Sequence, residues 1–277
     1  MIQLYNADCM EKLKEIPDGT VDMILCDLPY GTTDNVWDKV LPLPELWAHY
    51  KRVTKENAAI VLFSQLPFSC DLINANRSMF RYEWVWRKTM AVGFLNANKM
   101  PLRAHENILV FYRKLPVYNP QKTYGKAWTK TGGAHASTNY GRQREHVGQS
   151  DGDTRFPVDV LTFSNGHGNH NSFHPTAKPV ELMEYFIKTY TNPGDTVLDN
   201  TMGGGSTGVA CVHTGRSFIG MELNKDYFQT AERRIANAEF NGIETGRFTG
   251  SGNSGAELPL QGSLFALDCG KVRANIS

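Results

Sequence analysis

The sequence predicts an α/β fold built on a parallel, doubly wound sheet, and three observations support this. Short apolar runs that suit strands alternate with amphipathic segments that suit helices, which is the order of a doubly wound sheet. The alternation lapses between about residue 115 and residue 172 and resumes at Pro179. A glycine-rich turn, "DNTMGGGST", then joins a strand to a helix. The 277 residues therefore predict one large domain with an inserted segment.

The first part of the chain supplies most of the predicted strands. Their residues are apolar, aromatic or β-branched and are bounded by turn residues, as is typical of strands. The expected strands are residues 2–8, 21–27, 58–64, 80–88 and 107–113. Apolar residues at helical spacing predict helices at residues 9–16, 43–54 and 68–77.

The α/β pattern of the second part begins with a helix at residues 179–190, which Pro opens and "TNPGD" closes. A strand at 196–199, a helix at 206–215, a strand at 217–222 and a helix at 225–240 are expected to follow. The tail at residues 245–277 contains many Gly and Ser residues, so we expect it to be mobile.

Composition argues against several classes of protein. Apolar runs are shorter than a membrane span and the N-terminus lacks a secretion signal, so a cytoplasmic protein is expected. Five cysteines without a CxxC pair suggest neither zinc nor a redox site. His167, His170 and His174 lie close together in sequence, but no Cys or acidic spacing completes a site, so no metal is predicted.

Positive charge is concentrated in the middle of the chain. Residues 77–150 hold thirteen Lys or Arg against three acidic residues, a net charge of +10 in a chain of net charge +1, together with eleven aromatic residues. This mixture suits a nucleic acid, whereas the alternative is a solvated basic face above core aromatics. The residues predicted to contact DNA are Trp37, Arg87, Lys88, Arg103, Lys122, Lys126, Lys130, Arg142 and Arg144.

The glycine-rich turn suits a ligand that carries both an anionic and a cationic group. Gly203, Gly205 and Gly208 match the GxGxxG spacing, and the amides that open the following helix favour an anion. Asp199 stands just before the turn, where it would repel a pyrophosphate but attract an ammonium. The methionine moiety of S-adenosylmethionine has both groups. Glu222 ends the next strand, where an acid reaches ribose hydroxyls in this class of fold.

Two motifs and their order resemble the amino-methylating DNA methyltransferases. "DLPY" is similar to their Asp/Asn/Ser-Pro-Pro-Tyr signature, and "DNTMGGGST" with "GME" is similar to their S-adenosylmethionine site. "HPTAKPVELMEYFI" resembles the segment before their cofactor strand. The catalytic motif precedes the cofactor motif with the basic segment between them, as in the beta class. The resemblance covers residues 2 to about 114 and 156 to about 240.

The resemblance implies a methyltransferase Rossmann-like sheet with a permuted order of motifs and an inserted target-recognition region. Residues 1–114 would form the catalytic half, 115–172 the recognition insert and 173–244 the cofactor-binding half. Double-stranded DNA is the implied partner, and a homodimer is a further expectation because such relatives are often dimers.

Several cofactor contacts also follow from the resemblance. Lys178 would pair with the methionine carboxylate, Asp8 and Cys9 would flank the adenine, and Met202 would compensate for Thr201, which stands where the family usually has Phe. The residues expected to hold S-adenosylmethionine are Asp8, Cys9, Asp27, Thr176, Lys178, Asp199, Thr201, Met202, Gly203, Gly205, Ser206 and Glu222.

The implied reaction is methylation of an exocyclic amino group on a flipped base. The nitrogen lone pair is delocalised into the ring, so Asp27 and the Leu28 carbonyl would each accept an N–H and stabilise the pyramidal nitrogen. Pro29 would hold the turn, and Tyr30 would stack on the base. Leu28 replaces the first Pro of the signature but keeps the carbonyl.

The acid at the first position of "DLPY" favours adenine over cytosine as the target base. Four alternatives stay open: a cytosine-amino methyltransferase, an RNA or protein-amide methyltransferase, a DNA-binding protein without turnover, and a dehydrogenase suggested by the GxGxxG spacing.

Overall fold

The computed structural model describes residues 1–31, 38–125, 129–132, 135–137, 141–143, 146–149, 153–165 and 177–240, with the backbone alone within 130–149. The described residues form two compact units, one from Met1–Asn119 and Asp159 onward, and one from Pro120–Val158. Within the described ranges, no helix is long and apolar enough to cross a membrane.

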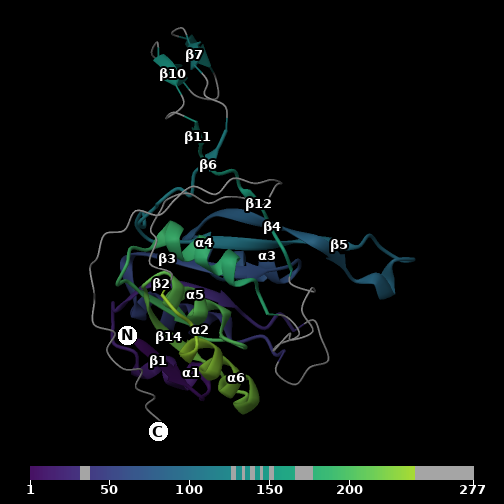
Figure 1. Cartoon of the computed structure of the whole chain (residues 1–277), viewed down its shortest axis with the longest axis vertical. Coiled ribbons are helices and arrows are strands. Elements are labelled where there is room, and N and C mark those ends of the chain that lie inside the picture. The colour runs from purple at the N-terminus through teal and green to yellow at the C-terminus, as the bar shows by residue number, and fades with distance from the viewer. Residues whose placement is uncertain are drawn as a thin grey trace. The chain divides into compact units, whose positions relative to one another are not determined.

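The first unit is built on an eight-stranded sheet in the order β1-β14-β13-β2-β3-β5-β4-β12 (Figure 1). Its strands are β1 (Ile2–Tyr5), β2 (Val21–Asp27), β3 (Thr54–Ser64), β4 (Phe80–Val92), β5 (Arg103–Phe111), β12 (Val160–Phe163), β13 (Thr196–Asp199) and β14 (Ser217–Met221).

The predicted doubly wound α/β class is confirmed, with one departure from a wholly parallel sheet. All neighbours run parallel except that β5 is antiparallel to both β3 and β4. The reason is the connection: β5 follows β4 through a hairpin, whereas a parallel pair needs a longer crossover.

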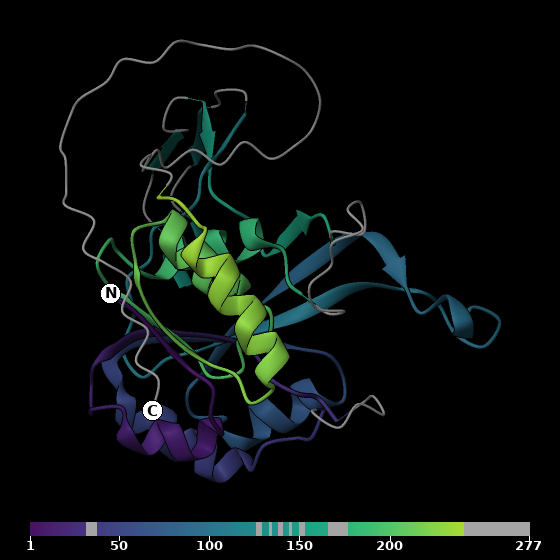
Figure 2. The ribbon, with the colours of Figure 1, turned by 60° about the horizontal axis from the view of Figure 1, so that its bottom comes forward.

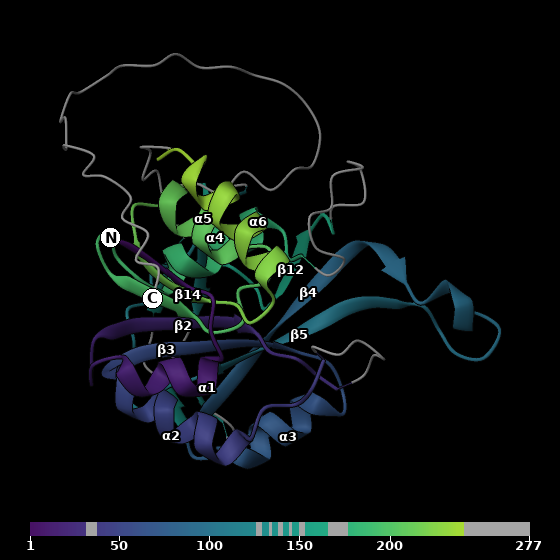
Figure 3. The ribbon, with the colours of Figure 1, turned by 90° about the horizontal axis from the view of Figure 1, so that it is seen from below.

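Helices cover both faces of the sheet. Figure 3 shows α1 (Cys9–Lys12), α2 (Leu43–Val53) and α3 (Phe68–Ala75) below it, and α4 (Val180–Tyr190), α5 (Ser206–His213) and α6 (Lys225–Ala236) above it. Because both faces are covered, β2 from Met23 to Cys26 and β3 from Ala58 to Phe63 are continuous buried apolar runs. α2 buries one apolar face, formed by Leu46, Trp47, Tyr50 and Val53.

The edge of the sheet differs from the predicted boundaries. β4 and β5 are longer than expected and form an extended hairpin, seen at the right of Figure 2. β12 pairs with β4 from Val160↔Val85 onward, so this strand belongs to the first unit rather than to the predicted insert. The described part of the second unit, Pro120–Val158, therefore covers fewer residues than the insert expected at residues 115–172.

In its described residues, the second unit has three antiparallel strand pairs nested along the chain. The outer pair is β6 (Thr123–Tyr124) with β11 (Thr154–Arg155), the middle pair is β7 (Thr129–Gly132) with β10 (His146–Gln149), and the inner pair is β8 (His135–Ser137) with β9 (Gly141–Gln143). The polar, Gly-rich sequence of this segment has no clear period of two, so the strands were not predicted.

Candidate active site

Two of the predicted site residues, Asp27 and Asp199, lie at the centre of the sheet, where β2 and β13 are neighbours. From β2 the chain continues through α2 to β3 on one side, and from β13 it continues through α5 to β14 on the other. The strand order reverses between these two strands, and open α/β sheets bind ligands at the carboxyl ends of such a pair. Asp27 ends β2 and Asp199 ends β13, so both acids lie at this position.

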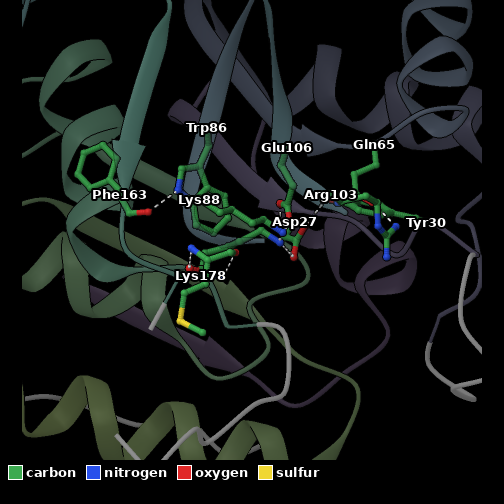
Figure 4. Close-up of polar contacts among 11 residues, drawn as sticks. Asp27, Tyr30, Gln65, Trp86, Lys88, Arg103, Glu106, Phe163 and Lys178 are labelled. Carbon is green, nitrogen blue, oxygen red and sulfur yellow. Dashed lines mark hydrogen bonds and ion pairs between the residues drawn. The ribbon is translucent and has the colours of Figure 1, made fainter. Parts of the chain in front are cut away.

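Asp27 has a defined partner on each carboxylate oxygen. The Tyr30 hydroxyl donates to Oδ1 at 2.7 Å, and the Lys178 ammonium donates to Oδ2 at 2.6 Å (Figure 4). Burial, followed by the charge of Asp27, raises the pKa of Tyr30 well above its ordinary value, so this hydroxyl keeps its proton and acts as a donor. The Asp27 side chain is thus oriented from two sides before any substrate binds.

Lys178 belongs to a larger charged cluster, which we define as Asp27, Lys88, Glu106 and Lys178. The Lys178 Nζ atom lies 3.2 Å from Glu106 Oε2, and the Lys88 Nζ atom lies 2.6 Å from Glu106 Oε1. The side chains of Lys88, Glu106 and Lys178 are each 8% exposed. Two cations and two anions balance, as buried charges require.

The pKa values of this cluster reflect that balance. Burial opposes the charged form of Glu106, but Lys178 and Lys88 outweigh it and lower the pKa of this carboxyl. Burial likewise opposes the charge of Lys178, but Asp27 and Glu106 raise the pKa of its ammonium. Both groups therefore stay ionised at neutral pH.

Glu106 was not singled out from the sequence, although a signal existed. It is an acid within the buried part of β5, between exposed residues and the run "NILVF". A buried acid requires a cationic partner, which could have pointed to Lys178 and Lys88.

The glycine-rich turn connects β13 to α5 in a conformation that favours glycine at two positions. Gly203 has φ 51° and Gly205 has φ 79°. The Gly203 amide donates to Glu222 Oε2 at 3.0 Å, and the Asn224 amide donates to Glu222 Oε1 at 2.7 Å. Glu222 directly follows β14, so it holds the turn in place from the end of the strand next to β13.

Asp199 is 3% exposed and also braces the turn. Its carboxylate accepts hydrogen bonds from the Thr201 amide at 3.1 Å and the Thr207 hydroxyl at 2.6 Å. Burial raises the pKa of Asp199 to about 7, although these hydrogen bonds act in the opposite direction. The structure places Asp199 behind the turn, and its predicted contact with an ammonium remains a prediction.

Thr201 links the two halves of the site. Its hydroxyl donates to the main-chain oxygen of Asp27 at 3.1 Å, which ties the turn after β13 to the end of β2. Asn200 beside it accepts hydrogen bonds from the Tyr50 hydroxyl at 2.6 Å and the Cys26 thiol at 3.0 Å. The residue that replaces the expected Phe therefore has a structural contact of its own.

The other predicted cofactor residues lie around the same edge. Asp8 caps α1 by accepting from the Met10 amide at 2.8 Å, and Cys9 is buried beside it. Met202 and Ser206 are buried, and Leu28 is buried in the core that underlies the site. Thr176 lies outside the described residues.

The predicted DNA-contacting residues divide into three groups. Arg87 and Arg103 are exposed, and Lys122 in the second unit lies over the Phe156 ring. The prediction that Lys88 contacts DNA is corrected, because its ammonium is buried against Glu106 instead of facing solvent. Residues for which the structure gives no side chain are Trp37, Lys126, Lys130, Arg142 and Arg144.

Several aromatic residues of the basic segment belong to the core, among them Trp84 and Trp86. Trp84 donates to the Tyr190 hydroxyl, and Trp86 donates to the Phe163 carbonyl at 3.1 Å. For these two the alternative reading, a core role, is correct. His167, His170 and His174 lie outside the described residues, and the residues that the structure does describe contain no group of three metal-ligating side chains.

The site residues fit S-adenosylmethionine in their chemistry. The carboxylates of Asp8 and Glu222 can accept hydrogen bonds from hydroxyl or amino groups, and the turn at Gly203 lacks a Cβ that would keep a ligand away from the backbone. Asp27, which would face the reacting nitrogen, lies on the adjoining strand.

The comparisons with known proteins agree with this geometry. The family model described as DNA methylase matches residues 21–233. The chain is 27% identical to the type II methyltransferase M.HpaI of Haemophilus parainfluenzae, over 88% of this chain and 76% of that protein. It is 28% identical to the DNA adenine methyltransferase YhdJ of Escherichia coli, over 84% of this chain and 82% of that protein.

A solved structure matches over nearly its whole length. The complex of M1.HpyAVI with S-adenosylmethionine superimposes with a TM-score of 0.60 at 27% identity, covering 85% of this chain and 99% of that one.

Proposed function

Because the chain belongs to the DNA methylase family, we propose that it transfers a methyl group from S-adenosylmethionine to the exocyclic amino group of adenine in DNA. The family, the Rossmann-like fold and the cofactor predicted from the sequence are thereby confirmed. The observation that carries the proposal is Asp27, held between Tyr30 and Lys178 at the strand end that adjoins the glycine-rich turn.

Adenine is favoured over cytosine for two reasons. The signature begins with Asp, and the relative YhdJ is named a DNA adenine methyltransferase. The catalytically weak alternative is less favoured, because Asp27 is present with both partners, an ion pair to Lys178 and a hydrogen bond from Tyr30.

The chain's part in the reaction is to bind and orient the amino group. Each carboxylate oxygen can accept two hydrogen bonds, so Asp27 can accept an N–H from the base without losing Lys178 or Tyr30. The Leu28 carbonyl would accept the second N–H. The two acceptors favour the pyramidal nitrogen and direct its lone pair away from the protein, towards the methyl group that bound S-adenosylmethionine supplies.

The cluster holds the Asp27 carboxylate in place for this step. Lys178 is itself held by Glu106, and Glu106 by Lys88, so the position of the carboxylate depends on all three. The proton released by the methylated nitrogen can pass to Asp27 or to solvent.

The contacts proposed for S-adenosylmethionine involve both halves of the site. Glu222 would accept hydrogen bonds from the ribose hydroxyls, and Asp8 and Cys9 would flank the adenine. The turn at Gly203–Gly205 would bind the methionine moiety. Lys178 was expected to pair with the methionine carboxylate, but it is engaged by Asp27 and Glu106, so we propose that it acts on Asp27 instead.

Double-stranded DNA as substrate and a homodimer as active form are further parts of the proposal. Duplex DNA is supported by the basic, aromatic segment at residues 77–150. The homodimer is supported only by the resemblance to the beta class.

The test is direct methylation of unmodified duplex DNA. The protein would be incubated with unmodified genomic DNA and S-adenosylmethionine, and modified bases would be mapped by sequencing. N6-methyladenine within one short motif is expected. Detection of N4-methylcytosine instead would show that cytosine is the target base. Transfer to RNA or protein without transfer to duplex DNA would overturn the proposal.

A further inference from the structure

The β4–β5 hairpin ends in an exposed apolar tip that has no part in the site described above. Figure 2 shows the two strands continuing past the other elements of the first unit. At the tip, which we define as residues 93–100, Phe94 is 76% exposed, Leu95 is 83% exposed and Met100 is 55% exposed. Single exposed apolar residues are common on protein surfaces, but a cluster of large ones points to a binding surface.

The hairpin is held firmly at its base. The Met90 amide donates to Asn165 Oδ1 at 3.0 Å, and Asn165 Nδ2 donates to the Met90 carbonyl at 2.8 Å. Further out, Val92 pairs with Arg103 across the two strands. The apolar tip is therefore carried on a two-stranded ribbon that is anchored to the main sheet.

The ribbon is also basic. Between Glu83 and Glu106 the sequence contains Arg87, Lys88, Lys99 and Arg103 and no acidic residue. Arg87, Lys99 and Arg103 are exposed, and Arg103 also donates to Gln65 Oε1 at 2.9 Å.

The charge of the ribbon identifies the kind of partner. Apolar side chains that insert among bases, flanked by cations that contact phosphates, are typical of DNA-binding arms. A second copy docked tip to tip by two-fold symmetry would bring cations such as Lys99 and Arg103 into proximity with their own copies, which is unfavourable. The charge pattern therefore favours DNA over self-association.

The hairpin leaves the sheet on the side of the active site. β4 runs in the same direction as β2, so its end at Val92 projects from the edge at which Asp27 lies. Lys88, which belongs to the charged cluster around Asp27, precedes Phe94 by six residues. At about 3.3 Å per strand residue, the tip lies up to about 20 Å beyond Lys88. This length equals about six base pairs of B-form DNA.

Building on the proposed function, we propose that the β4–β5 hairpin is a DNA-binding arm that contacts the duplex beside the target base. Phe94 and Leu95 pack against bases in a groove, and Lys99 and Arg103 contact phosphates up to about six base pairs from the target. A two-stranded ribbon has the width that the major groove admits.

The test compares the double variant Phe94→Ser/Leu95→Ser with the control Leu115→Ser in the full chain. Leu115 is 75% exposed and lies outside the hairpin, so its substitution removes a similar exposed side chain. Fluorescence anisotropy with unmodified duplex DNA should give a Kd about tenfold higher for the double variant, equal to about 1.4 kcal/mol. The Kd of the control, and the affinity of both variants for S-adenosylmethionine, should match wild type.

A second variant separates the apolar contacts from the ionic ones. Lys99→Gln should reduce the slope of log K against log salt by about one, because one phosphate contact is lost. The double variant should keep the wild-type slope.

Two results would overturn the inference. The first is a double variant that binds DNA as tightly as the control. The second is a weaker double variant whose sedimentation also shows the loss of a dimer, since the tip would then bind a second copy. Failure of the wild type to methylate DNA would instead overturn the proposed function, and the binding comparison would still decide the role of the hairpin.

Discussion

At the scale of single residues, Asp27 depends on partners from four separate segments of the chain. Tyr30 comes from the loop after β2, Lys178 from the segment before α4, Glu106 from β5 and Lys88 from β4. The acceptor role proposed for Asp27 follows from its own carboxylate and its position, whereas the other four residues hold that position.

The first prediction concerns the two acceptors of "DLPY". Asp27→Ala should lower kcat by about a thousandfold, because one preorganised acceptor at the reacting nitrogen is lost. Leu28→Pro should retain activity, since the chemistry uses the carbonyl and not the side chain. Methyl transfer to DNA measures both, and S-adenosylmethionine binding by each variant controls for folding. An active Asp27→Ala variant would contradict the mechanism.

A second prediction concerns the balance of the charged cluster. Glu106→Gln leaves Lys88 and Lys178 buried with one anion between them, and should destabilise the fold by about 3 kcal/mol. Adding Lys88→Met restores neutrality, so the double variant should recover part of this loss. Urea denaturation measures each variant. Additive losses in the double variant would show that the two charges do not interact.

A third prediction concerns the pH dependence that Asp199 imposes. Its pKa of about 7 in the fold lies above the value near 3.9 of an unfolded Asp, so the native state binds more protons between these values. Stability from this group is complete below about pH 4 and falls as the pH rises through about 7. The Tm of Asp199→Asn relative to wild type should therefore rise between about pH 5 and about pH 8. A constant difference would show that Asp199 is ionised throughout.

At the scale of elements, the close packing of α6 restricts which residues can occupy the turn between β13 and α5. A Cβ at Gly205 would lie 2.8 Å from Ala231 Cβ and 3.0 Å from Ala231 Cα, which belong to α6. The Arg234 guanidinium of the same helix donates to the Gly204 carbonyl. α6 thus limits which residues the turn can contain, independently of any ligand.

The fourth prediction isolates this close approach. Gly205→Ala and Gly19→Ala both place a side chain at a left-handed φ, 79° and 62°, but a Cβ at Gly19 meets no atom within 4 Å. Gly19→Ala should cost about 1 kcal/mol from backbone strain alone. Gly205→Ala should cost about 1–3 kcal/mol more, because the backbone of α6 must shift. Thermal unfolding of both variants gives the comparison, and equal losses would exclude the clash.

At the scale of the whole molecule, the proposed catalytic residues and most of the predicted recognition insert belong to different units. Asp27, the charged cluster and the glycine-rich turn lie in the first unit, and Pro120–Val158 form the described part of the second. The proposed reaction therefore needs the first unit for its chemistry, and the second is the candidate for selecting the sequence.

The fifth prediction follows from that division. Replacing residues 120–158 by a flexible Gly/Ser linker should leave the affinity for S-adenosylmethionine near that of wild type. Methylation at the preferred motif should fall by about a thousandfold, towards the level at other sites. Calorimetry and sequencing of treated DNA measure the two effects. Retention of the motif preference would place recognition in the first unit.

Most elements of the first unit could be predicted from the sequence, because each has a local signal. The apolar run of β2, the Pro that precedes α4 and the strand "TVLD" were predicted within one residue of their bounds. The β6–β11 strands could not be predicted, because their polar, Gly-rich residues carry little hydrophobic period. The direction of β5 depends on which strands it pairs with, and this is not a local property.

The sequence by itself determined the motifs, their order and the chemistry that "DLPY" and the glycine-rich turn can perform, because these depend on residue types and short spacings. Only the tertiary structure decided that Lys178 pairs with both Asp27 and Glu106 and that Lys88 is buried against Glu106, because residues distant in sequence come together there. A charged side chain looks the same in sequence whether it faces solvent or a buried partner. Burial and pairing, which set its energy and its role, are properties of the fold.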